Sequence, residues 1–165
     1  MARRKSYDIA LGGVLAALAV VIMALGGMIP VATFVCPMLC MVLLRFVLDR
    51  CEAAVSWAWY GVVAILGLLL SPDKEAAAVF VALGYYPILK PKMDKLPLKW
   101  LWKGIYFNAV ILIMYWLLMH LFGMAQVAAE FAEMGVVMTA VTLALGNVCF
   151  FLLDRLLSLR FRQRR

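Results

Sequence analysis

Few residues in this chain have side chains that could perform chemistry. There is one histidine, His120, and the serines are Ser6, Ser56, Ser71 and Ser158. A serine nucleophile needs a base within reach, but we expect Ser56 and His120 at opposite ends of apolar segments. The chain also lacks an HExxH sequence, a glycine-rich phosphate loop and a Walker motif. We therefore expect no catalytic residue, no cofactor and no enzymatic activity.

Acidic residues avoid the middle of the apolar segments. The nine are Asp8, Asp49, Glu52, Asp73, Glu75, Asp94, Glu130, Glu133 and Asp154. A charge at the centre of a bilayer is costly and usually marks an ion path, and ion-coupled transporters keep carboxylates there. This distribution argues against a proton- or sodium-coupled transporter.

Cysteines are the remaining candidates for metal binding. The chain has Cys36, Cys40, Cys51 and Cys149, and none has the paired spacing of a zinc site. Free cysteines commonly pack as small apolar side chains. We expect no metal site and no structural disulfide.

The elements that carry these residues are strongly apolar. Of 165 residues, 67% are hydrophobic and 15% are charged, whereas globular domains are roughly half apolar and a quarter charged. A helix needs about 20 apolar residues to cross a bilayer. Six runs come near that length, namely 7–28, 33–48, 53–70, 75–89, 101–122 and 134–157. We predict an all-α bundle of six transmembrane helices that forms one domain, residues 1–165.

Basic residues sort by the ends of these runs. All of them except Lys74 lie at alternate ends, beginning with the N-terminal Arg3, Arg4 and Lys5. Lysine and arginine accumulate in cytosolic loops, so the pattern predicts that both termini are cytosolic. The net charge of +7 then indicates topology and contact with anionic lipid, rather than nucleic-acid binding.

Polar and aromatic residues gather toward the predicted outer ends. Residues 126, 130 and 133 are expected in the third outer loop, and a spacing of four places Trp116 and His120 on one helix face. A solute-binding set would comprise Thr33, Phe34, Asp73, Lys74, Tyr115, Trp116, His120, Glu130, Glu133, Thr139 and Asn147. A polar stripe can instead serve hydrogen bonding between helices, and the sequence leaves both interpretations open.

Small residues are densest in the first run. Gly12 with Ala16, and Gly13 with Ala17, form two overlapping small-xxx-small pairs. Helices associate in lipid through close backbone approach at such residues. The pairs therefore predict either packing inside the bundle or contact with another membrane subunit.

The segment 90–103 carries five lysines, two prolines and two tryptophans. The prolines are expected to prevent a continuous helix. Trp100 and Trp102 suit the headgroup level, and the lysines suit anionic lipid or an acidic partner. We interpret this segment as an interfacial lipid anchor.

Two pentapeptides have similar sequences, Phe46-Val-Leu-Asp49-Arg50 and Phe151-Leu-Leu-Asp154-Arg155. They could be paired docking points for a cytosolic partner. The simpler interpretation, which we favour, is that a basic residue ends each helix where the dipole is negative and the side chain reaches the interface.

In its layout, the chain resembles the substrate-binding S component of energy-coupling factor transporters, which import vitamins. The pairs Gly12/Ala16 and Gly13/Ala17 occupy the place of that family's Ala-xxx-Ala patch on helix 1, with glycine replacing the first alanine. The resemblance implies a multi-pass protein of a bacterial-type cell membrane that binds a small solute from outside. It also implies partners, namely a transmembrane coupling subunit that contacts helix 1 and two cytosolic ATPases. The alternative is a small non-transporting membrane protein that binds lipid or scaffolds a complex.

Overall fold

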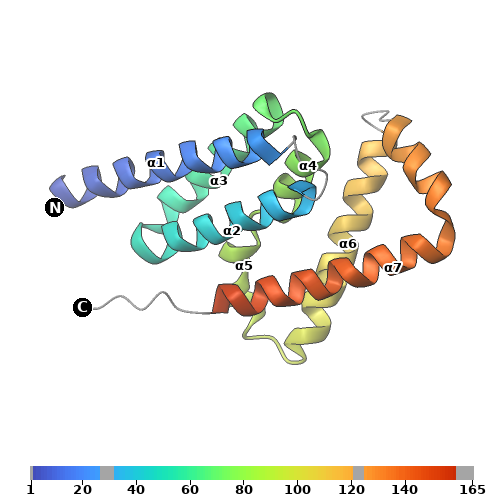
Figure 1. Cartoon of the computed structure of the whole chain (residues 1–165). Helices are drawn as coiled ribbons and strands as arrows, with labels where there is room; N and C mark the ends of the chain where they lie inside the picture. The colour runs from blue at the N-terminus through green and yellow to red at the C-terminus, as the bar shows by residue number, and fades with distance from the viewer. Residues whose placement is uncertain (1, 27–31, 121–124, 159–165) are drawn as a thin grey trace. The chain divides into compact units, whose positions relative to one another are not determined.

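The computed structural model describes residues 2–26, 32–120 and 125–158, and every element within them is helical (Figure 1). The helices are α1 (Ala2–Gly26), α2 (Ala32–Arg50), α3 (Ala53–Leu70), α4 (Lys74–Leu83), α5 (Tyr86–Met93), α6 (Lys99–His120) and α7 (Ala125–Ser158). Since these ranges contain no β-strand, the predicted all-α class is confirmed.

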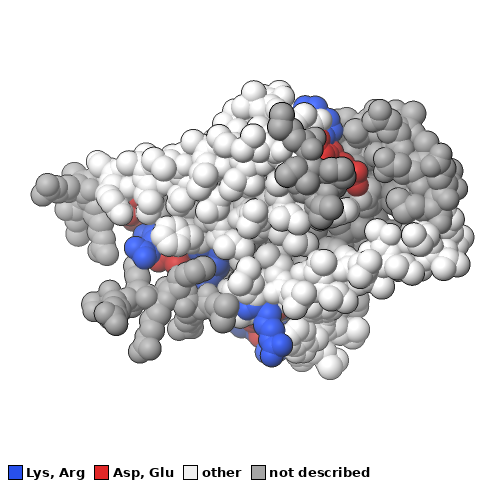
Figure 2. All heavy atoms as spheres, in the orientation of Figure 1, with Lys and Arg blue, Asp and Glu red and all other residues white. Residues whose placement is uncertain are grey.

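Four helical segments are long and apolar enough to cross a membrane. They are Ser6–Gly26, Ala53–Leu70, Lys99–His120 and Gly135–Ser158. Large apolar side chains on them remain exposed, among them Leu69 at 70% and Ile113 at 62%. On the face drawn in Figure 2, charged side chains occupy only small areas. Exposed apolar surface of this extent is typical of contact with lipid, so the structure indicates a membrane protein.

The chain forms two compact units, one built on residues up to Lys92 and the other on Met93–Leu159. In the first unit, α2 packs against α1, α3 and α4. Its core contains fully buried residues such as Met23, Cys40, Leu44 and Phe80. Small side chains at the contacts bring helices close together, and the thiol of Cys40 donates to the carbonyl of Ala19 at 3.6 Å. The helix α3 coincides with the predicted run 53–70.

The fourth predicted run is divided between α4 and α5. Pro87 explains the division because it has no N–H to donate to the carbonyl of Leu83, four residues earlier, and its ring crowds the preceding turn. Gly84 lies at the break, where an added Cβ would clash with the carbonyl oxygen of Phe80. Pro91 lies within α5. The chain remains helical to Met93, beyond the predicted run 75–89, and the expected interruption of the helix within 90–103 follows at residues 94–98.

Two of the six predicted spans, 33–48 and 75–89, are not among the four apolar segments. Helix α2 has 19 residues and a length of about 28 Å, close to the roughly 30 Å of a bilayer core. Helix α4 has 10 residues and reaches about 15 Å, so it needs the continuation through α5 to approach the same length. The six-span count remains a prediction.

The second unit is the pair α6–α7. The buried face of α6 carries Lys103, Phe107, Ile111, Met114 and Leu118, which recur at helical spacing. The backbone of α7 is interrupted at Gly135, whose φ of 64° and ψ of 171° suit glycine. Residues 125–134 before this kink are helical and lie outside the apolar segment Gly135–Ser158, which agrees with the predicted run 134–157.

Candidate functional site

One end of the first unit is closed by a hydrogen-bonded group around Asp73. Its Oδ2 accepts from the hydroxyl of Thr33 at 2.7 Å, and its Oδ1 accepts from the backbone N–H of Ala76 at 3.0 Å. The second bond makes Asp73 the N-cap of α4. Ser71 donates to the carbonyl of Met23 at 3.1 Å. This group connects four helix ends, one from each of α1, α2, α3 and α4. Asp73 and Thr33 therefore have structural roles, in addition to any contact with a solute.

Two other predicted binding residues lie in this unit. The ammonium of Lys74 donates to the carbonyl of Leu68 at 2.8 Å from an exposed position. The ring of Phe34 is 41% exposed. Both side chains are exposed, whereas Asp73 and Thr33 are half-buried.

In the second unit, the predicted aromatic face of α6 is confirmed as a local arrangement. The rings of Trp116 and His120 stack with centroids 5.1 Å apart and an angle of 17°. Nδ1 of His120 lies 3.1 Å from the carbonyl oxygen of Trp116, which fixes the imidazole against its own helix. Trp116, which follows Tyr115 in the sequence, is 58% exposed. Its ring therefore presents an accessible flat aromatic surface.

The hydroxyls of α7 are satisfied within that helix. Thr139 donates to the carbonyl of Gly135, and Thr142 donates to that of Met138, each at 2.9 Å. Both residues are four positions after their acceptors, so neither hydroxyl links two helices. Glu130 and Glu133 lie outside the described side chains.

Asn147 has an interhelical partner that sequence analysis did not name. Its amide and that of Asn108 exchange two hydrogen bonds, each 3.0 Å long. Each amide also donates to a carbonyl of its own helix, at Gly104 and Leu143, at 2.8 Å. The sequence left two interpretations open for Asn147, solute binding and hydrogen bonding between helices. The contacts of Asn147 in the structure correspond to hydrogen bonding between helices.

A buried ionic group lies one turn inside the ends of α6 and α7. The ammonium of Lys103 donates to both carboxylate oxygens of Asp154, at 2.8 and 3.0 Å, and to Oδ1 of Asp94 at 2.6 Å. Lys103 and Asp154 are each 2% exposed. The sequence placed these residues at helix ends but did not pair them. Asn147 and Asp154 are seven residues apart and therefore lie on one face of α7. This spacing was the only sign in the sequence that the two polar residues could contact the same neighbouring helix.

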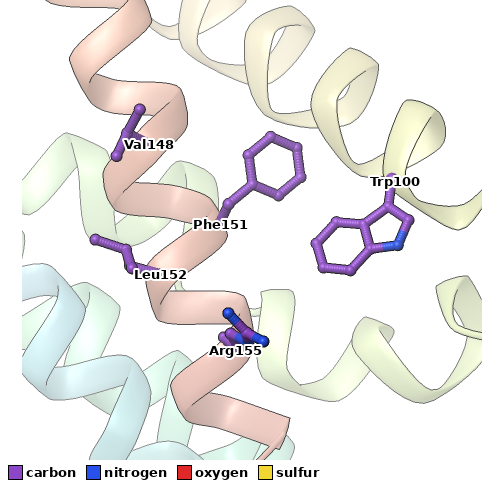
Figure 3. A pocket seen from close by; sticks show the side chains of 5 residues that line it. All are labelled: Trp100, Val148, Phe151, Leu152 and Arg155. Atoms are coloured by element: carbon purple, nitrogen blue, oxygen red, sulfur yellow. The ribbon is translucent and has the colours of Figure 1, made fainter.

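This ionic group also positions an aromatic cluster. Nζ of Lys103 lies 5.7 Å from the ring centroid of Trp100, which in turn lies 5.6 Å from the ring of Phe151. Figure 3 shows Trp100 and Phe151 projecting toward each other from facing helices. Trp100 is therefore held between a cation and a second ring.

A surface hollow of about 420 Å³ lies beside this cluster, and we call it the Arg155 hollow. Its lining residues are Trp100, Val148, Phe151, Leu152 and Arg155 (Figure 3). A second hollow of about 580 Å³ shares Trp100 and Phe151 and follows α6 as far as Leu112. Four of the five residues around the first are apolar or aromatic, so its one charged side chain, Arg155, defines its chemistry.

The two small-residue pairs of α1 have different surroundings. Gly12 and Ala16 are buried, and a Cβ added at Gly12 would lie 3.4 Å from Val55 of α3. Gly13 and Ala17 are exposed, and a Cβ at Gly13 would meet nothing within 4 Å. One pair packs inside the unit, and the other is open.

The four cysteines are free thiols, of which Cys36 and Cys40 are buried and Cys149 is exposed. The thiol of Cys51, between α2 and α3, donates to the carbonyl of Asp8 at 3.6 Å. Burial and, to a smaller extent, the carboxylate of Asp8 raise the pKa of this thiol. Cys51 is therefore a poor nucleophile at neutral pH. Within the described ranges, no three His, Cys, Asp or Glu residues come together as metal ligands.

Comparisons with known proteins add no relative, because no family model, no curated protein and no solved structure matches this chain. The helices and their exposed apolar surface define the class, an all-helical membrane protein with four candidate spans.

Proposed function

We propose that the chain is the membrane-embedded, solute-binding subunit of an ATP-driven importer of the energy-coupling factor type. The observation that supports this best is the open pair on α1. Gly13 and Ala17 are exposed on a helix whose neighbouring pair, Gly12 and Ala16, is already packed. A small-xxx-small face with no neighbour permits close approach of another helix in lipid. In this proposal, that helix belongs to the coupling subunit.

The proposal includes six spans with both termini in the cytosol of a bacterial-type cell. Helix α2 is long enough for the second span, and α4 followed by α5 forms a broken fourth span. With six spans, every basic residue but Lys74 lies on the cytosolic side. If α2 did not cross the membrane, Arg45 and Arg50 would lie on the outer side, against the usual bias.

A solute would be recognised by groups that remain accessible. The Trp116–His120 stack offers a flat aromatic face for a solute with a ring or a positive charge. In the first unit, considered by itself, the exposed Lys74 and Phe34 offer a cation and an aromatic ring. The substrate class proposed is accordingly a vitamin or similar small micronutrient.

The test is affinity purification of the tagged chain from its native membrane in mild detergent. Mass spectrometry would identify both the proteins and the small molecules recovered. We expect a membrane coupling subunit, two ATPases and a stoichiometric vitamin-like solute. Recovery of an unrelated membrane complex would contradict the proposal and favour a scaffold.

A matched pair of variants sharpens this test. Gly13→Leu adds bulk to the open face of α1, and Gly61→Leu adds it to α3, where a Cβ also meets nothing within 4 Å. Gly13→Leu is expected to abolish recovery of the coupling subunit and ATPases, while Gly61→Leu retains it. Docking through α1 would be refuted if both variants lost the coupling subunit and ATPases equally, or if both retained them.

A further inference from the structure

Arg155 is a surface cation without a protein counter-ion among the described residues. The adjacent acid, Asp154, is buried and directs both carboxylate oxygens to Lys103. The charge of Lys103 is in turn satisfied by Asp154 and Asp94. The positive charge at the rim of the Arg155 hollow therefore comes from Arg155 and is available to an external anion.

The similar pentapeptide on α2 provides a comparison within the chain. The guanidinium carbon of Arg50 lies 5.0 Å from the ring centroid of Phe46, four residues earlier. Asp49, beside it, pairs with Arg45 at 3.0 Å. Arg50 therefore rests over its own aromatic neighbour, whereas Arg155 lines a hollow with Trp100 and Phe151.

The apolar lining continues from this hollow along α6. The second hollow extends from Trp100 to Leu112, and twelve residues of helix correspond to about 18 Å. One leaflet of the bilayer core is about 15 Å deep, half of its roughly 30 Å thickness. The two hollows share Trp100 and Phe151, and their combined lining, which we call the groove, runs from Arg155 and Trp100 to Leu112, a length that suits an acyl chain.

We propose that this groove binds one anionic phospholipid, with the phosphate on Arg155 and an acyl chain along α6 from Trp100 toward Leu112. Charge complementarity selects the occupant, because a guanidinium bonds a phosphate through two parallel N–H groups. Trp100 lies at the headgroup level, where tryptophan is enriched. The ionic group around Lys103 keeps its ring in place.

The test is native mass spectrometry of the full-length chain in detergent, titrated with phosphatidylglycerol or with phosphatidylcholine of the same acyl chains. The wild type is expected to retain one phosphatidylglycerol in preference to phosphatidylcholine. Arg155→Gln should weaken phosphatidylglycerol binding about fivefold, the effect of one cation at an anionic lipid surface. Arg50→Gln, which removes the same charge from the similar pentapeptide, should leave binding unchanged.

A third variant tests the apolar part of the groove. Val148→Trp fills the hollow without altering charge, so it should reduce phosphatidylglycerol retention while Arg155 remains. Circular dichroism would verify that each variant is as helical as the wild type. Equal retention of both lipids by the wild type would overturn the proposal, independently of any variant. Equal weakening by Arg50→Gln and Arg155→Gln would also overturn it, because binding would then follow total charge.

Discussion

The ammonium of Lys103 lies within 3.0 Å of both carboxylate oxygens of Asp154, and each residue is only 2% exposed. This pair joins α6 to α7 at the end of the second unit. A buried ion pair gains little over a well-packed apolar pair, but removing one partner leaves the other charge buried without compensation. The pair should therefore be sensitive to single substitutions and tolerant of a double one.

Lys103→Met is expected to destabilise the protein by about 3–5 kcal/mol, since it leaves Asp154 buried without a cation. The double variant Lys103→Met, Asp154→Leu should recover most of that loss. Unfolding in SDS, followed by circular dichroism in mixed micelles, would measure both. Lys99→Met provides the control, because Lys99 is exposed one turn earlier in the same helix. Additive losses in the double variant would exclude a direct interaction.

The amide pair is a second point of attachment between α6 and α7. Asn147→Leu would leave the amide of Asn108 without its interhelical partner. Hydrogen bonds between membrane helices contribute about 0.6 kcal/mol on average and up to about 1.7, so we expect a loss within that range in the same unfolding experiment. Thr142→Val removes a hydroxyl that bonds only its own helix. If both variants lost equal stability, the amide pair would have no special role.

Gly84 is predicted to resist substitution for steric reasons. A Cβ there would clash with the carbonyl oxygen of Phe80 and would lie 2.9 Å from the ring of Phe80. Gly84→Ala should therefore destabilise the first unit by about 1–3 kcal/mol, the usual cost of overpacking. Gly61→Ala should stabilise it by about 0.5–1 kcal/mol, because Gly61 is inside a helix with free space around it. A neutral Gly84→Ala would show that the chain relaxes at this break.

Periodicity and length predicted most of the helices. The run 53–70 matched α3 fully because Glu52 and Ser71 at its ends adopt extended backbone conformations. The division between α4 and α5 was missed because Pro87 was counted as part of an apolar run. Residues 125–134 lie in the connection expected between the last two predicted runs, and the structure shows that they are helical up to the kink at Gly135.

The site was less predictable, because tertiary contacts decide which polar residues meet. Asp73 was expected near a solute, and its oxygens accept hydrogen bonds from Thr33 and Ala76. Lys103 belonged in the sequence to a lysine-rich segment and was not distinguished from its neighbours. Only the packing of α6 on α7 separates it from the exposed Lys99. Likewise, the sequence does not show which of the two small-residue pairs of α1, Gly12/Ala16 or Gly13/Ala17, faces the core of the first unit.

The six-span topology predicts that Asp73 and Gln126 lie outside and that Lys95 lies in the cytosol. A chain whose native cysteines are replaced would carry one new cysteine at 73, 126 or 95, and a membrane-impermeant maleimide would be added to intact cells. Labelling is expected at 73 and 126, and at 95 only after the membrane is opened. Asp73 caps α4, so Lys74→Cys serves as a second reporter for that end. Labelling of position 95 in intact cells would refute the orientation. Protection of position 74 with labelling at 126 would show that α1 to α4 do not cross the membrane as proposed, because the sorting of basic residues requires both positions to share one side.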